Sequence, residues 1–97
     1  MSTPLHPSEI ELALKELPEW TYEDDRLNRE MEFGSFKEAM AFIVRVGFEA
    51  ESLNHYPEIF CVFDRVALSL TSVDAEMKVT QRDVLLAHKI EALIAAE

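Results

Sequence analysis

The segment from Ser35 to Asn54 constrains the fold of this chain more than any other part of the sequence. Its apolar residues recur at the spacing of an amphipathic helix, and they are Phe36, Ala39, Met40, Ile43, Val46, Ala50 and Leu53. Ser35 and Glu38 have the spacing of a capping box, which predicts where the helix begins. Pro57 stops any continuation. At 1.5 Å per residue, such a helix is about 30 Å long, enough to cross a whole small domain.

A first β-hairpin is predicted before this helix. Trp20 and Tyr22 alternate with polar residues, and a second alternating segment covers residues 27–33. Asp24-Asp25 lies between the two segments and suits a turn, because aspartate side chains bond readily to nearby backbone. Arg29 interrupts the apolar side of the second segment.

A second hairpin is predicted after the helix. Residues 59–63 form a continuous β-prone run, in which Cys61 is expected to be a core residue. Residues 66–71 alternate between apolar and polar side chains, which is typical of a strand with one buried face. Asp64-Arg65 is the predicted turn between them.

Two shorter helices are predicted near the ends of the chain. One begins at Ser8 and ends before Pro18, and the other begins at Thr80, whose spacing to Asp83 repeats the capping box. The predicted order is therefore α-β-β-α-β-β-α. Because hairpins make a sheet mainly antiparallel, we predict an α+β fold in which helices cover one face of a four-stranded sheet. No linker divides the sequence, so residues 1–97 form one predicted domain.

The charge and cysteine content narrow the classes of partner. The chain has 19 acidic and 9 basic residues, which gives a formal net charge of −10. Since phosphate contacts come mainly from lysine and arginine, this balance argues against direct nucleic-acid binding and against an anionic membrane surface. The single cysteine forms no internal disulfide and cannot build a structural zinc site alone. With no signal-peptide pattern at the start, we predict a cytoplasmic protein.

His55 is the residue with the best placement for chemistry. It follows the long helix directly, where terminal carbonyl groups favour a protonated imidazole. Glu51 precedes it by four residues, so a contact across one turn is expected if the last turn stays helical. Pro57 pushes Tyr56 into an extended conformation. From spacing alone, the simpler interpretation is that His55 only caps the helix.

The segment Ala50-Glu51-Ser52-Leu53-Asn54-His55-Tyr56-Pro57-Glu58 resembles the pterin-4a-carbinolamine dehydratases, a family also known as the dimerisation cofactor of a homeodomain transcription factor. In that family, the helix ends in a charged residue, three others and then His-His-Pro. The likeness continues through the second hairpin, Val79-Thr80-Gln81-Arg82-Asp83 and the closing helix. It therefore covers nearly the whole chain, and the fold that it implies is the α+β fold predicted above.

The resemblance implies a hydro-lyase that dehydrates 4a-hydroxytetrahydropterins, such as 4a-hydroxytetrahydrobiopterin, in pterin recycling. The reaction removes a proton from a ring nitrogen and assists departure of the 4a-hydroxyl group as water. Imidazoles suit both steps, and neither a metal nor a bound cofactor is implied. The site residues implied by the resemblance are His55 as acid–base residue, Glu51 as the residue that orients it, and Tyr56, Pro57, Val73 and Asp74 as substrate-binding positions.

Two of the three histidines of that family are replaced in this chain. His55 matches the first, Tyr56 replaces the second, and the third position falls on Val73, or on Asp74 if the alignment gap is moved earlier. Tyrosine, with an unperturbed pKa of about 10, is a poor base at neutral pH. Since removing one general acid or base costs about 10²–10⁴ in rate, the sequence leaves open an enzyme with weak or lost activity.

The alternative is a non-catalytic protein on the same fold. The resemblance implies that such a protein would be a scaffold for protein contacts, for example a dimerisation cofactor or a Rubisco assembly chaperone. In either case the resemblance implies a homodimer or homotetramer. The small size of the chain agrees with self-association, since a chain this short buries only about 60–65% of its unfolded surface. A pterin is the expected small-molecule partner if the enzyme is active.

Overall fold

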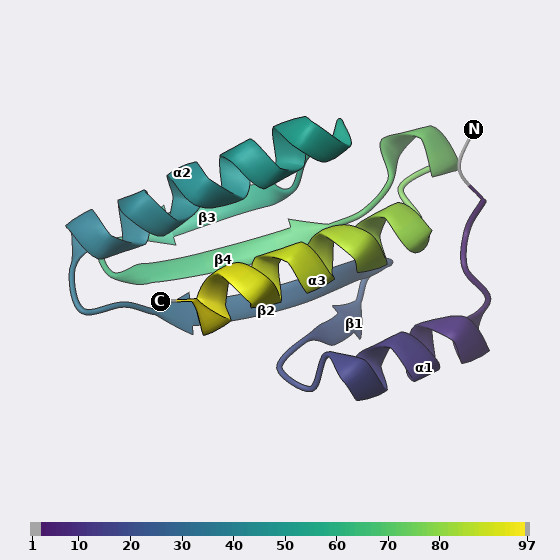
Figure 1. Cartoon of the computed structure of the whole chain (residues 1–97). Helices are drawn as coiled ribbons and strands as arrows, with labels where there is room; N and C mark the ends of the chain where they lie inside the picture. The colour runs from purple at the N-terminus through teal and green to yellow at the C-terminus, as the bar shows by residue number, and fades with distance from the viewer. Residues whose placement is uncertain (1–2, 97) are drawn as a thin grey trace.

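The computed structural model describes residues 3–96. Within that range the elements follow the predicted order: α1 (Pro7–Glu16), β1 (Thr21–Glu23), β2 (Arg26–Glu32), α2 (Phe36–Leu53), β3 (Glu58–Val62), β4 (Arg65–Leu70), the 3-10 turn η1 (Val73–Ala75) and α3 (Gln81–Ala95) (Figure 1). The strands form one antiparallel sheet in the order β1-β2-β4-β3. The predicted α+β fold is confirmed.

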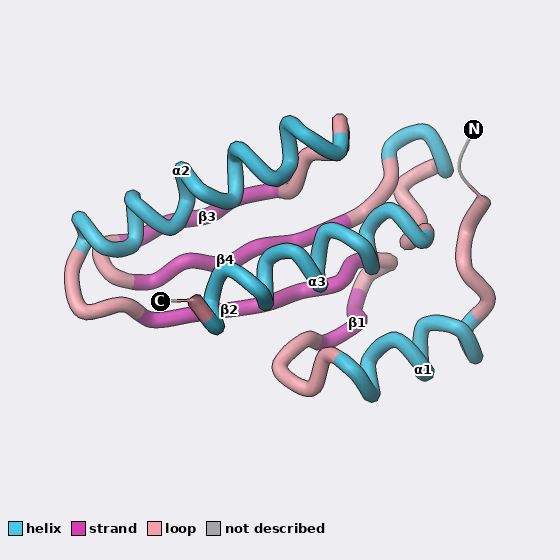
Figure 2. The backbone as a smooth tube through the Cα atoms, in the orientation of Figure 1, coloured by secondary structure: helices cyan, strands magenta, loops and turns pink. Residues whose placement is uncertain are grey.

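The hydrophobic core lies mainly between the sheet and the helices α2 and α3, and α1 adds Ile10 to it. Figure 2 shows α2 and α3 lying across the same face of the sheet, whereas α1 lies beside β1. Alternate residues of the strands point toward these helices, as a side-chain period of two requires. The fully buried core side chains include Leu27, Phe42, Val46, Val66, Leu68, Leu70, Leu86 and Ile90. Cys61 is only half-buried and packs against the edge of this core.

The two hairpin turns differ in how well the sequence predicts them. Asp24 and Asp25 form the first turn as predicted, both with positive φ, 55° and 58°. In the second hairpin, Val62 pairs with Arg65, so the two-residue loop lies one residue earlier than predicted, at residues 63–64. The reason is that Arg65 also pairs with Glu32 of β2, which keeps it within the strand.

The helix starts are set by side-chain caps. The Ser35 hydroxyl accepts a hydrogen bond from the Glu38 amide, which confirms the predicted start of α2. The first helix begins one residue earlier than predicted, because His6 caps it. The His6 Nδ1 atom accepts from the Ser8 amide, and the Glu9 carboxylate accepts from the His6 amide.

Arg29, which interrupts the apolar side of β2 in the sequence, binds a carboxylate from the helix above it. Its Nε atom donates to Glu91 Oε2 of α3 at 2.9 Å, and the Trp20 indole Nε1 donates to the same oxygen at 3.1 Å. The helix-facing side of the sheet thus accommodates a charged residue because α3 supplies its counter-ion.

The longest helix, α2, carries apolar residues on two sides. One side packs on the sheet through Ala39, Phe42, Val46 and Ala50. The other side carries four exposed residues at four-residue spacing, Phe36, Met40, Val44 and Phe48, which we call the outer stripe. No helix in the described part of the chain, α2 included, has the length and apolar content needed to cross a bilayer.

We predict that Glu91→Ala lowers the free energy of unfolding by about 1–3 kcal/mol, because Arg29 and Trp20 lose their shared acceptor. Urea unfolding followed by fluorescence of Trp20, the single tryptophan, measures this change. The matched control is Lys89→Ala, at an exposed position on the same helix, which is expected to change the free energy by less than about 0.5 kcal/mol. Equal effects of the two substitutions would contradict the role given to Glu91.

Candidate active site

The end of α2 meets two segments that lie far from it in the sequence, η1 and the first turn of α3, at one end of the sheet. Between them lies a pocket of about 450 Å³, lined by Asn54, His55, Tyr56, Thr71, Val73, Asp74 and Arg82. Four of the candidate site residues therefore lie together around this pocket: His55, Tyr56, Val73 and Asp74. Glu51 and Pro57 do not line this pocket.

The left-handed backbone of Asn54 directs His55 away from the helix. Asn54 has φ 53° and ψ 43°, and its amide donates to the carbonyl groups of Ala50 and Glu51. Asparagine tolerates this conformation better than most residues, and it ends many helices. As a result, the His55 side chain leaves the face of α2 and lies buried, with 6% of its surface exposed.

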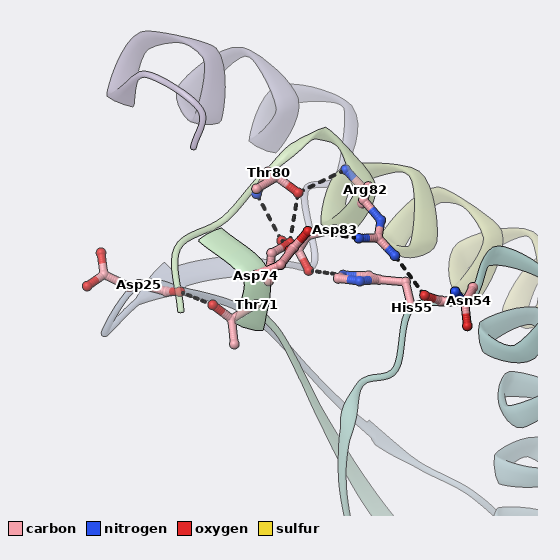
Figure 3. A network of polar contacts seen from close by, with 9 residues as sticks. Asp25, Asn54, His55, Thr71, Asp74, Thr80, Arg82 and Asp83 are labelled. Carbon is pink, nitrogen blue, oxygen red and sulfur yellow. Dashed lines mark hydrogen bonds and ion pairs between the residues drawn. The ribbon is translucent and has the colours of Figure 1, made fainter. Parts of the chain in front are cut away.

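The His55 ring is held by a fully buried carboxylate, that of Asp83 in the first turn of α3 (Figure 3). His55 Nε2 and Asp83 Oδ1 are 2.5 Å apart. The other carboxylate oxygen, Oδ2, accepts from the Ser72 hydroxyl at 2.8 Å and from the Thr80 amide at 2.9 Å. Three donors therefore satisfy the buried carboxylate and keep it in one position.

This network determines which nitrogen of His55 is available for chemistry. A carboxylate only accepts hydrogen bonds, so Nε2 is the donor and the neutral ring is left with an unprotonated Nδ1. Among the described residues, no buried side-chain nitrogen or oxygen lacks a partner. No hydrogen bond to Nδ1 is found in that range, and His55 is one of the residues that line the pocket.

Glu51 contacts Tyr56 and not His55, which corrects the expectation that Glu51 orients the imidazole. The Tyr56 hydroxyl lies 3.1 Å and 3.3 Å from the two oxygens of the Glu51 carboxylate, and donates to it. Since the helix ends at Asn54, His55 is no longer one helical turn from Glu51. The hydrogen bond to Glu51 raises the pKa of Tyr56 above its usual value, so the phenol stays a donor.

The sequence does not indicate Asp83 as the residue that holds the imidazole. The Thr80-to-Asp83 spacing predicts a capping box, and the structure contains that box. The same carboxylate, however, uses its second oxygen for His55, a residue 28 positions away along the chain. The only signal in the sequence is the cap itself, which gives no indication of a distant partner.

Other candidate positions lie away from this pocket. His6 caps α1, and His88 Nε2 lies 3.4 Å from a carboxylate oxygen of Glu16. A larger hollow, of about 730 Å³, lies on the uncovered face of the sheet and has no histidine in its lining. Across residues 3–96, no three histidine, cysteine or acidic side chains are grouped so as to hold a metal ion.

Comparison with known proteins gives a consistent result. A model of the pterin 4 alpha carbinolamine dehydratase family matches residues 3–93. A protein of Opitutus terrae named as a pterin-4-alpha-carbinolamine dehydratase is 48% identical over 93 residues, which are 96% of each chain. A protein of the same name from Solibacter usitatus is 41% identical over 95 residues, covering 98% of this chain and 99% of the relative.

A solved structure has the same fold. The crystal structure of a transcriptional coactivator/pterin dehydratase from Brucella melitensis superposes with a TM-score of 0.87 at 33% identity, and the match covers 93% of this chain and 97% of the other. Sequence and structure therefore agree over nearly the whole chain. This chain belongs to the pterin-4a-carbinolamine dehydratase family.

Proposed function

We propose that the chain dehydrates a 4a-hydroxytetrahydropterin at the pocket beside His55. The observation that carries this proposal is the orientation of the imidazole. The buried Asp83 carboxylate holds Nε2, and Nδ1 of this pocket-lining residue has no hydrogen-bond partner among the described residues. A neutral imidazole held in this way can act as a general base, and the carboxylate stabilises the imidazolium that forms.

In the proposed reaction, the N–H bond of the pterin ring nitrogen beside C4a breaks, and its proton passes to Nδ1 of His55. The electron pair of that bond forms the C=N bond, while the C4a–O bond breaks. The departing hydroxyl group takes a proton and leaves as water, so His55 returns to its neutral form when it supplies that proton. The Tyr56 hydroxyl stays protonated and donates its proton to Glu51, and the Tyr56 side chain forms part of the pocket wall.

We predict that the chain accelerates dehydration of freshly generated 4a-hydroxytetrahydropterin above the rate in buffer, and that His55→Ala reduces this acceleration about 10²–10⁴-fold. Stopped-flow absorbance measures both rates. The control is His88→Ala, which removes an exposed histidine of α3 outside the pocket and is expected to leave the rate unchanged. A wild-type rate equal to that in buffer would exclude the dehydratase function.

We also predict that the double substitution Tyr56→His with Val73→His increases kcat by about 10-fold or more, because a second and a third imidazole would share the proton transfers. Both positions line the pocket next to His55. The same stopped-flow assay tests the double variant, with Val62→His on the exposed part of β3 as a control for an added histidine elsewhere. A kcat at or below that of the wild type would show that these positions do not limit the reaction.

A second candidate function is a scaffold for protein contacts, and it is favoured by the outer stripe of α2. The similar protein from Brucella melitensis is described as a transcriptional coactivator as well as a pterin dehydratase. For this chain, a net charge of −10 argues against direct nucleic-acid binding, so any such role is expected to act through contact with another protein.

We also propose that the chain is cytoplasmic, because a free thiol such as that of Cys61 is typical of a reducing compartment.

We propose that a second copy of the chain covers the outer stripe. If two α2 helices pair antiparallel about a two-fold axis at Val44, Met40 of one copy faces Phe48 of the other. The same axis places Ala41 opposite Gly47 and Lys37 opposite Glu51. A Cβ added at Gly47 would meet no atom within 4 Å, so the helices have room to approach closely. The stripe is thus complementary to itself, as a two-fold interface requires.

The edge of the sheet offers a second surface for the same kind of contact. β3 is the outermost strand on its side, and Phe60 and Val62 on it are exposed. An apolar edge strand without a partner favours pairing with another chain. Use of one of the two surfaces gives a homodimer, and use of both gives a homotetramer.

We predict that Val44→Glu weakens the α2 contact at least about 100-fold, because the two-fold axis brings two carboxylates together in an apolar interface. In sedimentation at micromolar protein concentration, the molecular mass of the Val44→Glu variant is expected to be half that of the wild-type assembly. The control is Leu12→Glu, which puts the same charge on an exposed apolar residue of α1. A monomeric wild type, or a Val44→Glu variant with the wild-type mass, would contradict the proposed interface.

A further inference from the structure

We infer that Arg82 is a positioning residue for His55, acting on the backbone that carries the imidazole. The inference rests on the proposed function only for its kinetic consequences, since the contacts themselves are independent of any reaction. Arg82 and Asp83 are adjacent in the first turn of α3, and they contact adjacent residues at the end of α2. Arg82 holds the backbone of Asn54, and Asp83 holds the ring of His55.

The contact with Asn54 is a short hydrogen bond at an otherwise exposed helix end. Arg82 Nη2 donates to the Asn54 carbonyl oxygen at 2.7 Å (Figure 3). This carbonyl belongs to the peptide group that joins Asn54 to His55, so its position determines where the His55 ring begins. Two attachment points, one on the backbone and one on the ring, define the direction of the side chain far better than one.

Arg82 also contacts η1, the third segment that forms the pocket. Its Nη1 atom lies 3.5 Å from the Asp74 carboxylate of η1, and its amide donates to the Thr80 hydroxyl oxygen. Both Asp74 and Arg82 line the pocket. The planar guanidinium group has donors that diverge in fixed directions, so one side chain reaches the end of α2 and η1 at once. A lysine, with a single ammonium group, does not reproduce both contacts.

An alternative role for Arg82 is direct binding of substrate, since its side chain is part of the pocket wall. The two roles predict different kinetics. A positioning residue that acts through His55 lowers kcat and leaves KM nearly unchanged, whereas a substrate-binding residue raises KM. A loss of placement of about 1 Å at a catalytic group costs up to about 100-fold in rate.

The test compares Arg82→Gln and Arg82→Lys with the wild type in two measurements. In the stopped-flow assay, we expect kcat to fall about 10–100-fold for Arg82→Gln and less for Arg82→Lys, with KM changing less than about 3-fold. In the nuclear magnetic resonance spectrum, the ring nitrogen shifts of His55 are expected to move in both variants. The control is Lys89→Gln, which removes a positive charge from an exposed position of the same helix outside the pocket and is expected to leave both readouts close to wild type.

A double-substitution cycle with His55→Ala separates positioning from a general loss of structure. If Arg82 acts through His55, then Arg82→Lys has no further effect on kcat once the imidazole is absent. A further loss in that background, or a rise of KM with kcat unchanged, overturns the inference. Unchanged His55 ring shifts in Arg82→Lys overturn it as well. If the wild type shows no dehydratase activity, the proposed function fails, and the ring shifts alone decide the role of Arg82.

Discussion

The candidate site beside His55 depends on one buried carboxylate, that of Asp83. Asp83 is fully buried and accepts from the Thr80 amide, the Ser72 hydroxyl and the His55 ring. Each donor comes from a different part of the chain: the start of α3, the segment after β4 and the end of α2. Because a buried carboxylate without donors is costly, these segments are stable only when they meet at this point.

This arrangement combines a structural role with a chemical one. The hydrogen bond between the Thr80 amide and Asp83 caps α3, and the same carboxylate orients the imidazole of His55. The hydroxyl groups of Ser72 and Thr80 complete the network. Ser72 donates its single hydroxyl proton to Asp83, so in the hydrogen bond between the two hydroxyl groups Thr80 is the donor and Ser72 the acceptor. The imidazole is therefore held in place by the same contacts that stabilise the start of the helix.

The rest of the pocket differs from the histidine-rich pattern that the family resemblance implies. Tyr56 is bound to Glu51 and stays protonated, and Val73 presents an exposed apolar side chain. In the proposed reaction, proton transfer therefore depends on His55. Contacts from α3 hold this residue, with Arg82 bound to the preceding carbonyl group and Asp83 bound to the ring. The outer stripe of α2 lies on the side of that helix away from the core, and a partner there would leave the sheet-facing contacts unchanged.

Much of the fold follows from local sequence patterns. The apolar spacing of α2, the capping boxes and the alternation in the strands predict the elements and their order, because each signal acts within a few residues. The local pattern places the second turn at Asp64-Arg65, one residue too late, because the pairing of Arg65 with Glu32 is a contact between strands that are distant in the sequence. In the sequence, Arg29 only interrupts the apolar side of the strand. Its partner, Glu91, is 62 residues away and contacts it because α3 packs on the sheet.

The amino-acid sequence predicts the helices and the hairpins, and it identifies His55, Tyr56, Val73 and Asp74 as candidate site residues. The partners of these residues depend on the tertiary structure. The left-handed residue Asn54 removes His55 from the face that it would share with Glu51, and directs it to Asp83. A hydrogen bond between residues 28 positions apart depends on how α2 and α3 pack on the sheet, and no local spacing specifies that packing.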